Sequence, residues 1–436
     1  MKGCERARAT FQKPKMQYQA VRGMRDVLPA EIPLWERLEH EARRLARAHG
    51  FREIRPPLVE ETALFIRSVG EVTDIVEKEM FSLQKGDAHL TLRPEATAGI
   101  ARAYLEAGFD KNAPLQRLFT IGPMFRGERP TKGRERQFTQ FDVECLGSLD
   151  PRLDAECIHM AASFFEALGI DGIEVRVNSM GDGEDREHFR EAVKTFVASQ
   201  LGERCELCRS RFERNVLRVL DCKTPACVEL NKKAPVLVDF LTDANRAHFD
   251  AVRSSLVALG RKSEVDTGIV RGLDYYTRTI FELHYPRFGA RSAMCGGGRY
   301  DHLLRDLGGS DLPAIGFAIG FTGTLILMQE LGLAKVVAPA PIDVYVVAAG
   351  AGLESRVLAL AQALRSGGLS AIYDVESRSV KSQFKAANSG GHPLVVVLGD
   401  AEQAAGTAQL KDMRNGTQEL VPQAELAARA RALLGR

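Results

Sequence analysis

Hydrophobic residues recur along the chain at spacings typical of helices and strands. Apolar positions predict a helix over Glu31–Ala48, whose buried face is formed by Leu34, Leu38, Ala42 and Leu45. The segment Arg52–Glu61 reads as a short strand, because Pro56 and Pro57 cannot continue a helix. Further strands are predicted over Leu115–Ile121, Gln137–Leu146, Ile173–Asn178, Val270–Leu283 and Ile315–Gly320. These strands are too scattered for a regular strand–helix–strand array, so we expect a mainly antiparallel sheet with flanking helices.

Two composition changes divide the chain. From about Gly181 to Gly260 the sequence turns helical and charged, which indicates a helical insertion over about 182–262. The segment VVAPAP at Val336–Pro341 reads as a linker, and strands and helices alternate after it. We therefore expect a tail over 1–20, an α+β domain over 21–335 that contains the insertion, and a smaller α/β domain with a parallel or mixed sheet over 341–436.

Composition narrows the function classes. The 436 residues suit two or three domains, and 45% hydrophobic with 27% charged residues is ordinary for a globular protein. A net charge of +2 excludes a polybasic binder, although a local basic stripe can still bind nucleic acid. No apolar run is long enough to span a membrane, and the basic start of the chain does not resemble a secretory signal. Eight cysteines are too few for a disulfide scaffold, so we expect a reduced, cytoplasmic setting.

Four of the cysteines follow a metal-ligand pattern. Cys205, Cys208, Cys222 and Cys227 have the spacing C-x2-C-x13-C-x4-C, which suits a structural zinc site with tetrahedral geometry. The alternative is a set of four reduced thiols in a helical insertion.

The segment from Phe125 to Glu144, FRGERPTKGRERQFTQFDVE, is the richest in chemistry. A run of charges usually forms a solvated hairpin. Here, however, Arg126 follows apolar residues in an expected strand, where an unpaired guanidinium is costly and a phosphate would satisfy its planar donors. Phe138 returns beside these cations and is suited to stacking on a flat base. The segment therefore favours a nucleotide site.

Two further segments carry candidate ligand groups. In TLRPEATAGIA, Glu95 follows the turn at Pro94, where its carboxylate either binds an ammonium group or simply favours the start of a helix. In VRGLDYYTRT, Arg271, Tyr275 and Tyr276 combine a fixed charge with phenolic donors. The glycines of CGGGRYD permit close approach of a ligand to the backbone, although glycine turns are common.

Together these segments resemble the class II aminoacyl-tRNA synthetases and, among them, the histidyl-tRNA synthetase family. The resemblance runs from about Val21 to Pro422. GMRDVLP resembles the family's amino-terminal signature, and REIRPPLVE its first motif, whose proline, best matched by Pro57, lies at the dimer interface. FRGERP with RQF resembles the second motif, and RGLDYYTRT and CGGGRYD resemble the two histidine-specific signatures. The stretch LGDAEQAAGTAQLKDM resembles part of the family's anticodon-binding domain.

The resemblance implies a function and a role for each matching residue. The fold would be an α+β catalytic domain with an antiparallel sheet, a helical insertion and a C-terminal α/β anticodon-binding domain. The reaction would join histidine to tRNA(His) with ATP and Mg²⁺, in a homodimer. Arg126 would bind the α-phosphate, Arg271 would stabilise the charge that develops there, and Glu128, Arg134 and Phe138 would hold the nucleotide. The histidine pocket would consist of Glu95, Thr97, Gln140, Glu144, Tyr275, Tyr276 and Tyr300.

One position departs from the family pattern. The third motif normally ends in an arginine that contacts the γ-phosphate, whereas AIGFAIGFTGTLIL has Gly323 there. Losing one charge-assisted hydrogen bond costs about 1.5–3 kcal/mol, which is roughly a 10- to 150-fold loss in binding or rate. Either another cation, Arg134 or Lys132, compensates, or adenylation is impaired. A histidine-sensing regulatory protein without turnover, and a simple tRNA-binding module, are therefore the alternatives to a ligase.

Overall fold

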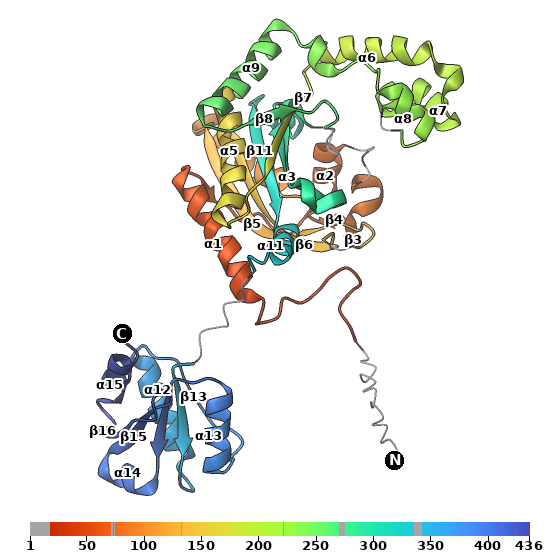
Figure 1. Cartoon of the computed structure of the whole chain (residues 1–436). Helices are drawn as coiled ribbons and strands as arrows, with labels where there is room; N and C mark the ends of the chain where they lie inside the picture. The colour runs from red at the N-terminus through yellow and green to blue at the C-terminus, as the bar shows by residue number, and fades with distance from the viewer. Residues whose placement is uncertain are drawn as a thin grey trace, which may run out of the picture. The chain divides into compact units, whose positions relative to one another are not determined.

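The computed structural model describes residues 18–70, 73, 75–131, 133–220, 222–269, 275–334 and 342–436. The chain divides into two compact units, Met1–Lys335 and Val336–Arg436 (Figure 1). The linker expected at Val336–Pro341 and most of the expected tail lie outside the described residues. Among the described helices, none has the length and apolar composition that a membrane span requires.

An eight-stranded sheet forms the centre of the first unit, in the order β1-β5-β6-β11-β10-β9-β7-β8. The strands are β1 (Arg52–Glu53), β5 (Gln116–Phe125), β6 (Gln137–Leu146), β7 (Glu174–Ser179), β8 (Ser263–Val265), β9 (Thr277–His284), β10 (Ala293–Arg299) and β11 (Ala314–Gly320). Only β1 with β5 and β7 with β8 pair in parallel, so the expected mainly antiparallel sheet is confirmed. The glycine run of CGGGRYD lies inside β10 and is not a turn.

The prediction of a single strand over Arg52–Glu61 is wrong. The segment forms β1 in the large sheet and then β2 (Val59–Glu61), which pairs with β4 (Ala88–Leu92) in a separate sheet completed by β3 (Phe81–Lys85). Pro56 and Pro57 lie between the two strands. Because proline has no N–H to donate to a ladder, the chain leaves one sheet at this point and joins the other.

Helices cover one face of the large sheet and enclose the main core. They are α1 (Ile32–Ala48), α5 (Pro151–Ala167), α9 (Asp243–Ala258) and α11 (Phe321–Glu330). On β6, the alternate residues Phe141, Val143 and Cys145 belong to this core. The side chains between them therefore point to the opposite face, since successive residues of a strand alternate. That face carries α3 (Thr97–Glu106), α10 (Leu303–Asp306) and a second core, with α2 (Thr62–Val69) and α4 (Phe109–Asn112) nearby in sequence.

The insertion is helical, as expected. Its helices α6 (Glu184–Ala198), α7 (Glu206–Arg214) and α8 (Pro225–Asn231) precede α9. In Figure 1, α7 and α8 lie side by side at the far end of α6, away from the helices on the sheet. They enclose a small core of their own.

The second unit is an α/β fold with a mixed sheet, as predicted. The strand order is β13-β12-β14-β15-β16. The strands β13, β12 and β14 are parallel to one another, whereas β15 is antiparallel to both of its neighbours, β14 and β16. The strands are β12 (Val344–Ala348), β13 (Ala371–Tyr373), β14 (Leu394–Leu398), β15 (Thr407–Asp412) and β16 (Gln418–Pro422). The helices are α12 (Glu354–Ser366), α13 (Val380–Ser389), α14 (Asp400–Ala405) and α15 (Leu426–Leu433).

Candidate active site

A cavity of about 380 Å³ lies over β6, β10 and β11 of the first unit. The residues from β6 that line it, Gln140, Asp142 and Glu144, alternate with those that face the helix core. The cavity also contains most of the predicted histidine-pocket residues: Glu95, Thr97, Tyr275, Tyr276 and Tyr300. Sequence segments as far apart as Glu95 and Tyr300 therefore meet at one site, as the family resemblance implied.

Glu144 is a buried residue that lines this cavity. Its carboxylate accepts hydrogen bonds from the Thr97 hydroxyl at 2.6 Å and from the Tyr300 hydroxyl. Gly316 of β11 pairs with Glu144, and a methyl group on Gly316 would lie 1.7 Å from the carboxylate oxygen. Glycine at this strand position is what makes room for the carboxylate. Burial raises the pKa of Glu144 well above its ordinary value.

Glu95 serves both as a helix-start residue and as a wall of the cavity. Its carboxylate accepts the backbone N–H groups of Thr97 at 2.7 Å and Ala98 at 2.9 Å, at the beginning of α3. Burial raises the pKa of Glu95, while these hydrogen bonds and the guanidinium of Arg126 oppose the rise. The two roles that the sequence left open for Glu95, binding an ammonium group and favouring the start of a helix, are thus compatible.

Asp142 was not singled out from the sequence, although it lies between two residues that were. Burial, and next the neighbouring Glu95, raise the pKa of Asp142 to about 8, against the opposing charges of Arg93 and Arg126. Its Oδ2 atom and the Oε1 atom of Gln140 are buried without a hydrogen-bond partner among the described residues. Unsatisfied acceptors call for a donor, so this part of the cavity suits an ammonium or ring N–H. Two-residue alternation along β6 was the signal that would have identified Asp142.

Arg93, which was also not singled out from the sequence, links two backbone segments near the site. Its guanidinium donates to the carbonyl oxygens of Pro123 at 3.0 Å and Pro56 at 3.1 Å. Burial lowers the pKa of Arg93, and the carboxylates of Asp142 and Glu95 counteract this effect.

The tyrosines form an aromatic wall. The ring centroids of Tyr275 and Tyr276 are 4.8 Å apart, and those of Tyr275 and Tyr300 are 5.5 Å apart. Tyr300 directly follows Arg299, whose buried guanidinium binds the buried carboxylate of Asp154 on α5 at 2.6 Å. This ion pair fixes the end of β10 and thereby the start of the segment that carries Tyr300.

The cations of the second motif border the cavity and an adjoining one of about 320 Å³. Arg126 lies just after β5 rather than within it, because the strand ends at Phe125. Its Nε atom donates to the Pro94 carbonyl at 2.9 Å, and its guanidinium carbon lies 5.2 Å from the ring centroid of Phe138. Glu128 and Phe138 line the second cavity.

The region around Gly323 has room for a larger residue. Gly323 lies in the first turn of α11 and borders both cavities. Among the described residues, a methyl group built on it would meet only Met294 Cε, at 3.9 Å. Arg134 borders the same two cavities, with a largely exposed side chain that lies 3.4 Å from the Glu128 carboxylate. Arg271 and Lys132 lie outside the described residues.

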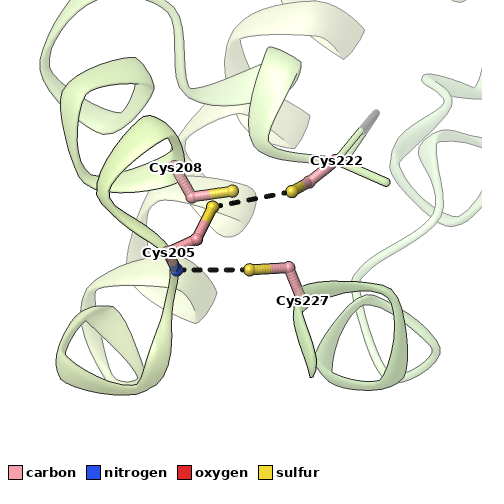
Figure 2. A group of neighbouring side chains, drawn as sticks. All are labelled: Cys205, Cys208, Cys222 and Cys227. Atoms are coloured by element: carbon pink, nitrogen blue, oxygen red, sulfur yellow. Dashed lines mark hydrogen bonds between the residues drawn. The ribbon is translucent and has the colours of Figure 1, made fainter. Parts of the chain in front are cut away.

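The four spaced cysteines come together in the insertion. Figure 2 shows Cys205, Cys208, Cys222 and Cys227 with their sulfur atoms directed toward one another. Their Sγ atoms all lie within 4.8 Å of one another. None of the four lines either cavity.

Comparisons with known proteins agree with this geometry. The family model described as histidyl-tRNA synthetase matches residues 23–323, and that described as anticodon binding domain matches residues 343–433. A histidine–tRNA ligase from a Synechococcus species is 44% identical over 94% of this chain and 97% of its own length. One from a Cyanothece species is 44% identical over 95% of this chain and 96% of its own. The solved structure of apo histidyl-tRNA synthetase from S. aureus matches with a TM-score of 0.78 at 31% identity, covering 94% of this chain and 99% of that one. The chain therefore belongs to the histidyl-tRNA synthetase family.

Proposed function

We propose that this protein is a histidine–tRNA ligase, which activates histidine with ATP and transfers it to tRNA(His). The observation that carries the proposal is the cavity lined by Glu95, Gln140, Asp142 and Glu144, which offers several buried acceptors beside the cations of the second motif. Such a site suits a ligand with an ammonium group and a polar ring at one end and a carboxylate facing a phosphate at the other. Family membership supports the same reading.

Recognition of the imidazole requires groups that answer both ring nitrogens. In the proposed complex, the Glu144 carboxylate accepts one ring N–H and the Tyr276 side chain faces the ring. Glu95, Thr97 and Gln140 receive the α-ammonium end, and Tyr275 and Tyr300 close the pocket. A site built to bind a polar ring leaves its own buried groups unpaired when an apolar isostere enters, and rejects it by on the order of 10⁴.

Activation places the histidine carboxylate against the α-phosphorus of ATP, which enters as its Mg²⁺ complex. A carboxylate oxygen attacks that phosphorus, the bond to the β-phosphate oxygen breaks, and pyrophosphate leaves. Arg126, with Arg271 by family resemblance, stabilises the charge on the α-phosphate without moving a proton. Phe138 stacks on the adenine, and Glu128 and Arg134 hold the nucleotide. A terminal ribose hydroxyl of the tRNA then attacks the adenylate carbonyl and releases AMP.

The domain boundaries follow the same assignment. We place the tail at 1–20, the catalytic domain at 21–335 with its insertion at about 182–262, and the anticodon-binding domain at 341–436. The two family-model matches and the two compact units support this division. The reaction belongs to the cytoplasm, where translation consumes its product.

A homodimer is part of the proposal. Pro57 is exposed, and apolar Leu58, Val59 and Leu83 around the three-stranded sheet are 41%, 39% and 44% exposed. Exposed apolar side chains around this sheet fit an interface between two copies. Light scattering should give the mass of two chains, and Leu58→Asp should shift it toward one; a monomeric wild type contradicts the dimer.

Histidine-dependent ATP–pyrophosphate exchange tests the ligase proposal. The full chain should catalyse exchange with histidine and charge tRNA(His). Glu144→Ala should abolish histidine binding, whereas Glu106→Ala, an exposed glutamate paired with Arg102, should leave it unchanged. Folded protein without exchange would refute the ligase.

Gly323 favours one second candidate, a histidine-sensing regulatory protein, because the expected γ-phosphate contact is missing. That protein would bind histidine with wild-type Glu144 but show no exchange. The two functions therefore separate in a single experiment that measures both binding and exchange.

A further inference from the structure

The four insertion cysteines lie in or just before the first turns of two short helices. Cys205 directly precedes α7, and Cys208 lies in its first turn. Cys227 lies in the first turn of α8, and Cys222 in the connection before it. Cys208, Cys222 and Cys227 are buried, and Cys205 is half-buried. The cluster thus joins segments that no regular hydrogen-bonded sheet connects.

The distances between the sulfur atoms match a tetrahedral metal site. Zinc–sulfur bonds of about 2.3 Å place the sulfur atoms of a tetrahedron about 3.8 Å apart. The Sγ atoms of Cys205 and Cys222 are 3.8 Å apart, and all four lie within 4.8 Å of one another (Figure 2). A disulfide requires about 2.05 Å, and the four cysteines are free thiols. The cluster is therefore too compact for unrelated thiols and too open for disulfides.

The hydrogen bonding around the cluster fits sulfur ligands. The backbone N–H of Cys205 donates to the Cys227 Sγ atom at 3.4 Å. Next to it, the buried Arg204 donates to the Asn231 side chain at 2.8 Å, and Asn231 donates in turn to the carbonyl oxygens of Val219 and Leu220. These contacts fix the backbone on both sides of the cysteines, as outer-sphere groups do in metal sites.

The surrounding core is small for an independent module. Its fully packed members are Phe189, Val193, Val197, Val216 and Val219 together with Cys208, Cys222 and Cys227. Small cores of this kind usually require a disulfide or a metal. Since no disulfide links the four cysteines, a metal ion that they bind together would supply such a cross-link.

We propose that Cys205, Cys208, Cys222 and Cys227 bind one Zn²⁺ ion that stabilises the insertion. The four thiols lose their protons on binding, and the four thiolates complete the coordination sphere. A closed sphere leaves no position for water or substrate, so the ion is structural and takes no part in adenylation. This inference does not rest on the proposed function.

Metal analysis of the full chain, purified without chelator, tests the proposal. We expect about one zinc per chain, and substitution by Co²⁺ should give the sulfur-to-metal charge-transfer and intense d–d absorption of a tetrahedral thiolate site. Iron, substoichiometric zinc, or a Co²⁺ spectrum lacking thiolate bands would overturn it.

Matched variants assign the ligands. Cys208→Ser and Cys227→Ser should each lower zinc content at least several-fold, whereas Cys157→Ala, a buried cysteine on α5, should retain it. Zinc retained by both cluster variants would contradict the assignment. Chelation should accelerate proteolytic cleavage within residues 200–231 while leaving the sheet of the first unit protected; unchanged cleavage would show that the ion does not stabilise the insertion.

Discussion

Individual carboxyl groups dominate the chemistry of the cavity. Glu95, Asp142 and Glu144 are buried together, and burial raises the pKa of each. Without a cationic ligand they cannot all ionise at low cost, because like charges repel strongly away from water. Asp142, whose pKa is about 8, therefore retains its proton at neutral pH in the unliganded site, and in the proposed complex the histidine ammonium group favours its ionised form.

Replacing Asp142 should change how the stability of the folded chain depends on pH. Its pKa lies at about 8 in the folded chain, against the ordinary 3.8. Its favourable contribution is complete below about pH 4 and is lost as pH rises toward 8, because the unfolded chain releases the proton earlier. Asp142→Asn should remove this slope and raise the melting temperature of the ligand-free protein at pH 8 by a few degrees. An unchanged pH profile in thermal unfolding contradicts it.

The same substitution should weaken histidine binding by about 10-fold or more, the cost of one charge-assisted contact. Asp150 provides the control. Hydrogen bonds from Arg152 lower the pKa of Asp150 to about 2, so its contribution is present above its ordinary pKa and is lost as pH falls. Asp150→Asn should therefore change stability without altering histidine affinity in calorimetric titration; equal losses of affinity in both variants would remove Asp142 from the site.

A second prediction concerns Gly323. The described residues leave space for a side chain at this position, and arginine favours a helix over glycine by up to about 1 kcal/mol. Gly323→Arg should fold normally and raise the exchange rate at limiting ATP by about 10- to 150-fold, if no other cation reaches the γ-phosphate. Arg134→Ala distinguishes the alternatives: a large loss there, with no gain from Gly323→Arg, would mean that Arg134 already compensates.

At the level of elements, the pattern of apolar residues predicted part of the large sheet but missed β3, β4 and β8. β5, β6, β7 and β11 were identified because each contains apolar residues that pack in the helix core. β10 was not identified, since its glycines have no side chains to show a pattern; only pairing on both sides defines it as a strand. Alternation along β6 places Asp142 on the same face as Gln140 and Glu144, but its raised pKa depends on burial and on Glu95, which only the tertiary structure brings close.

Gly316 is the element-level test of the pocket. Gly316→Ala would force its methyl group against the Glu144 carboxylate and the Val143 carbonyl oxygen, at 1.7 and 2.5 Å. We expect destabilisation by about 1–3 kcal/mol and loss of histidine binding, measured by denaturant unfolding and titration. Gly320→Ala on the same strand meets no described atom within 4 Å and should bind histidine normally. Normal binding by Gly316→Ala would argue against the placement of Glu144.

At the level of the whole molecule, the two units have separate cores. Residues 1–335 contain every described residue assigned to histidine and ATP. A chain ending at Lys335 should therefore keep histidine-dependent exchange within a few-fold of the full chain. Its rate of tRNA(His) charging should fall by at least 10-fold, because the proposed anticodon contacts are gone. Charging at the full rate would exclude that role for the second unit.

Strand β6 has a further consequence for the assembled enzyme. Phe138, Gln140, Asp142 and Glu144 occupy every second position of one extended strand, so they are spaced along it in steps of about 7 Å. In the proposed reaction, adenine lies at the Phe138 end of this strand and imidazole at the Glu144 end. The backbone repeat of the strand therefore sets the distance between the two ligands. Deleting one residue within the strand would turn the side chains beyond the deletion to the opposite face. Those that line the cavity would then point into the core. A deletion within β6 should therefore disrupt both the core and the site, whereas a substitution changes the contacts of one residue.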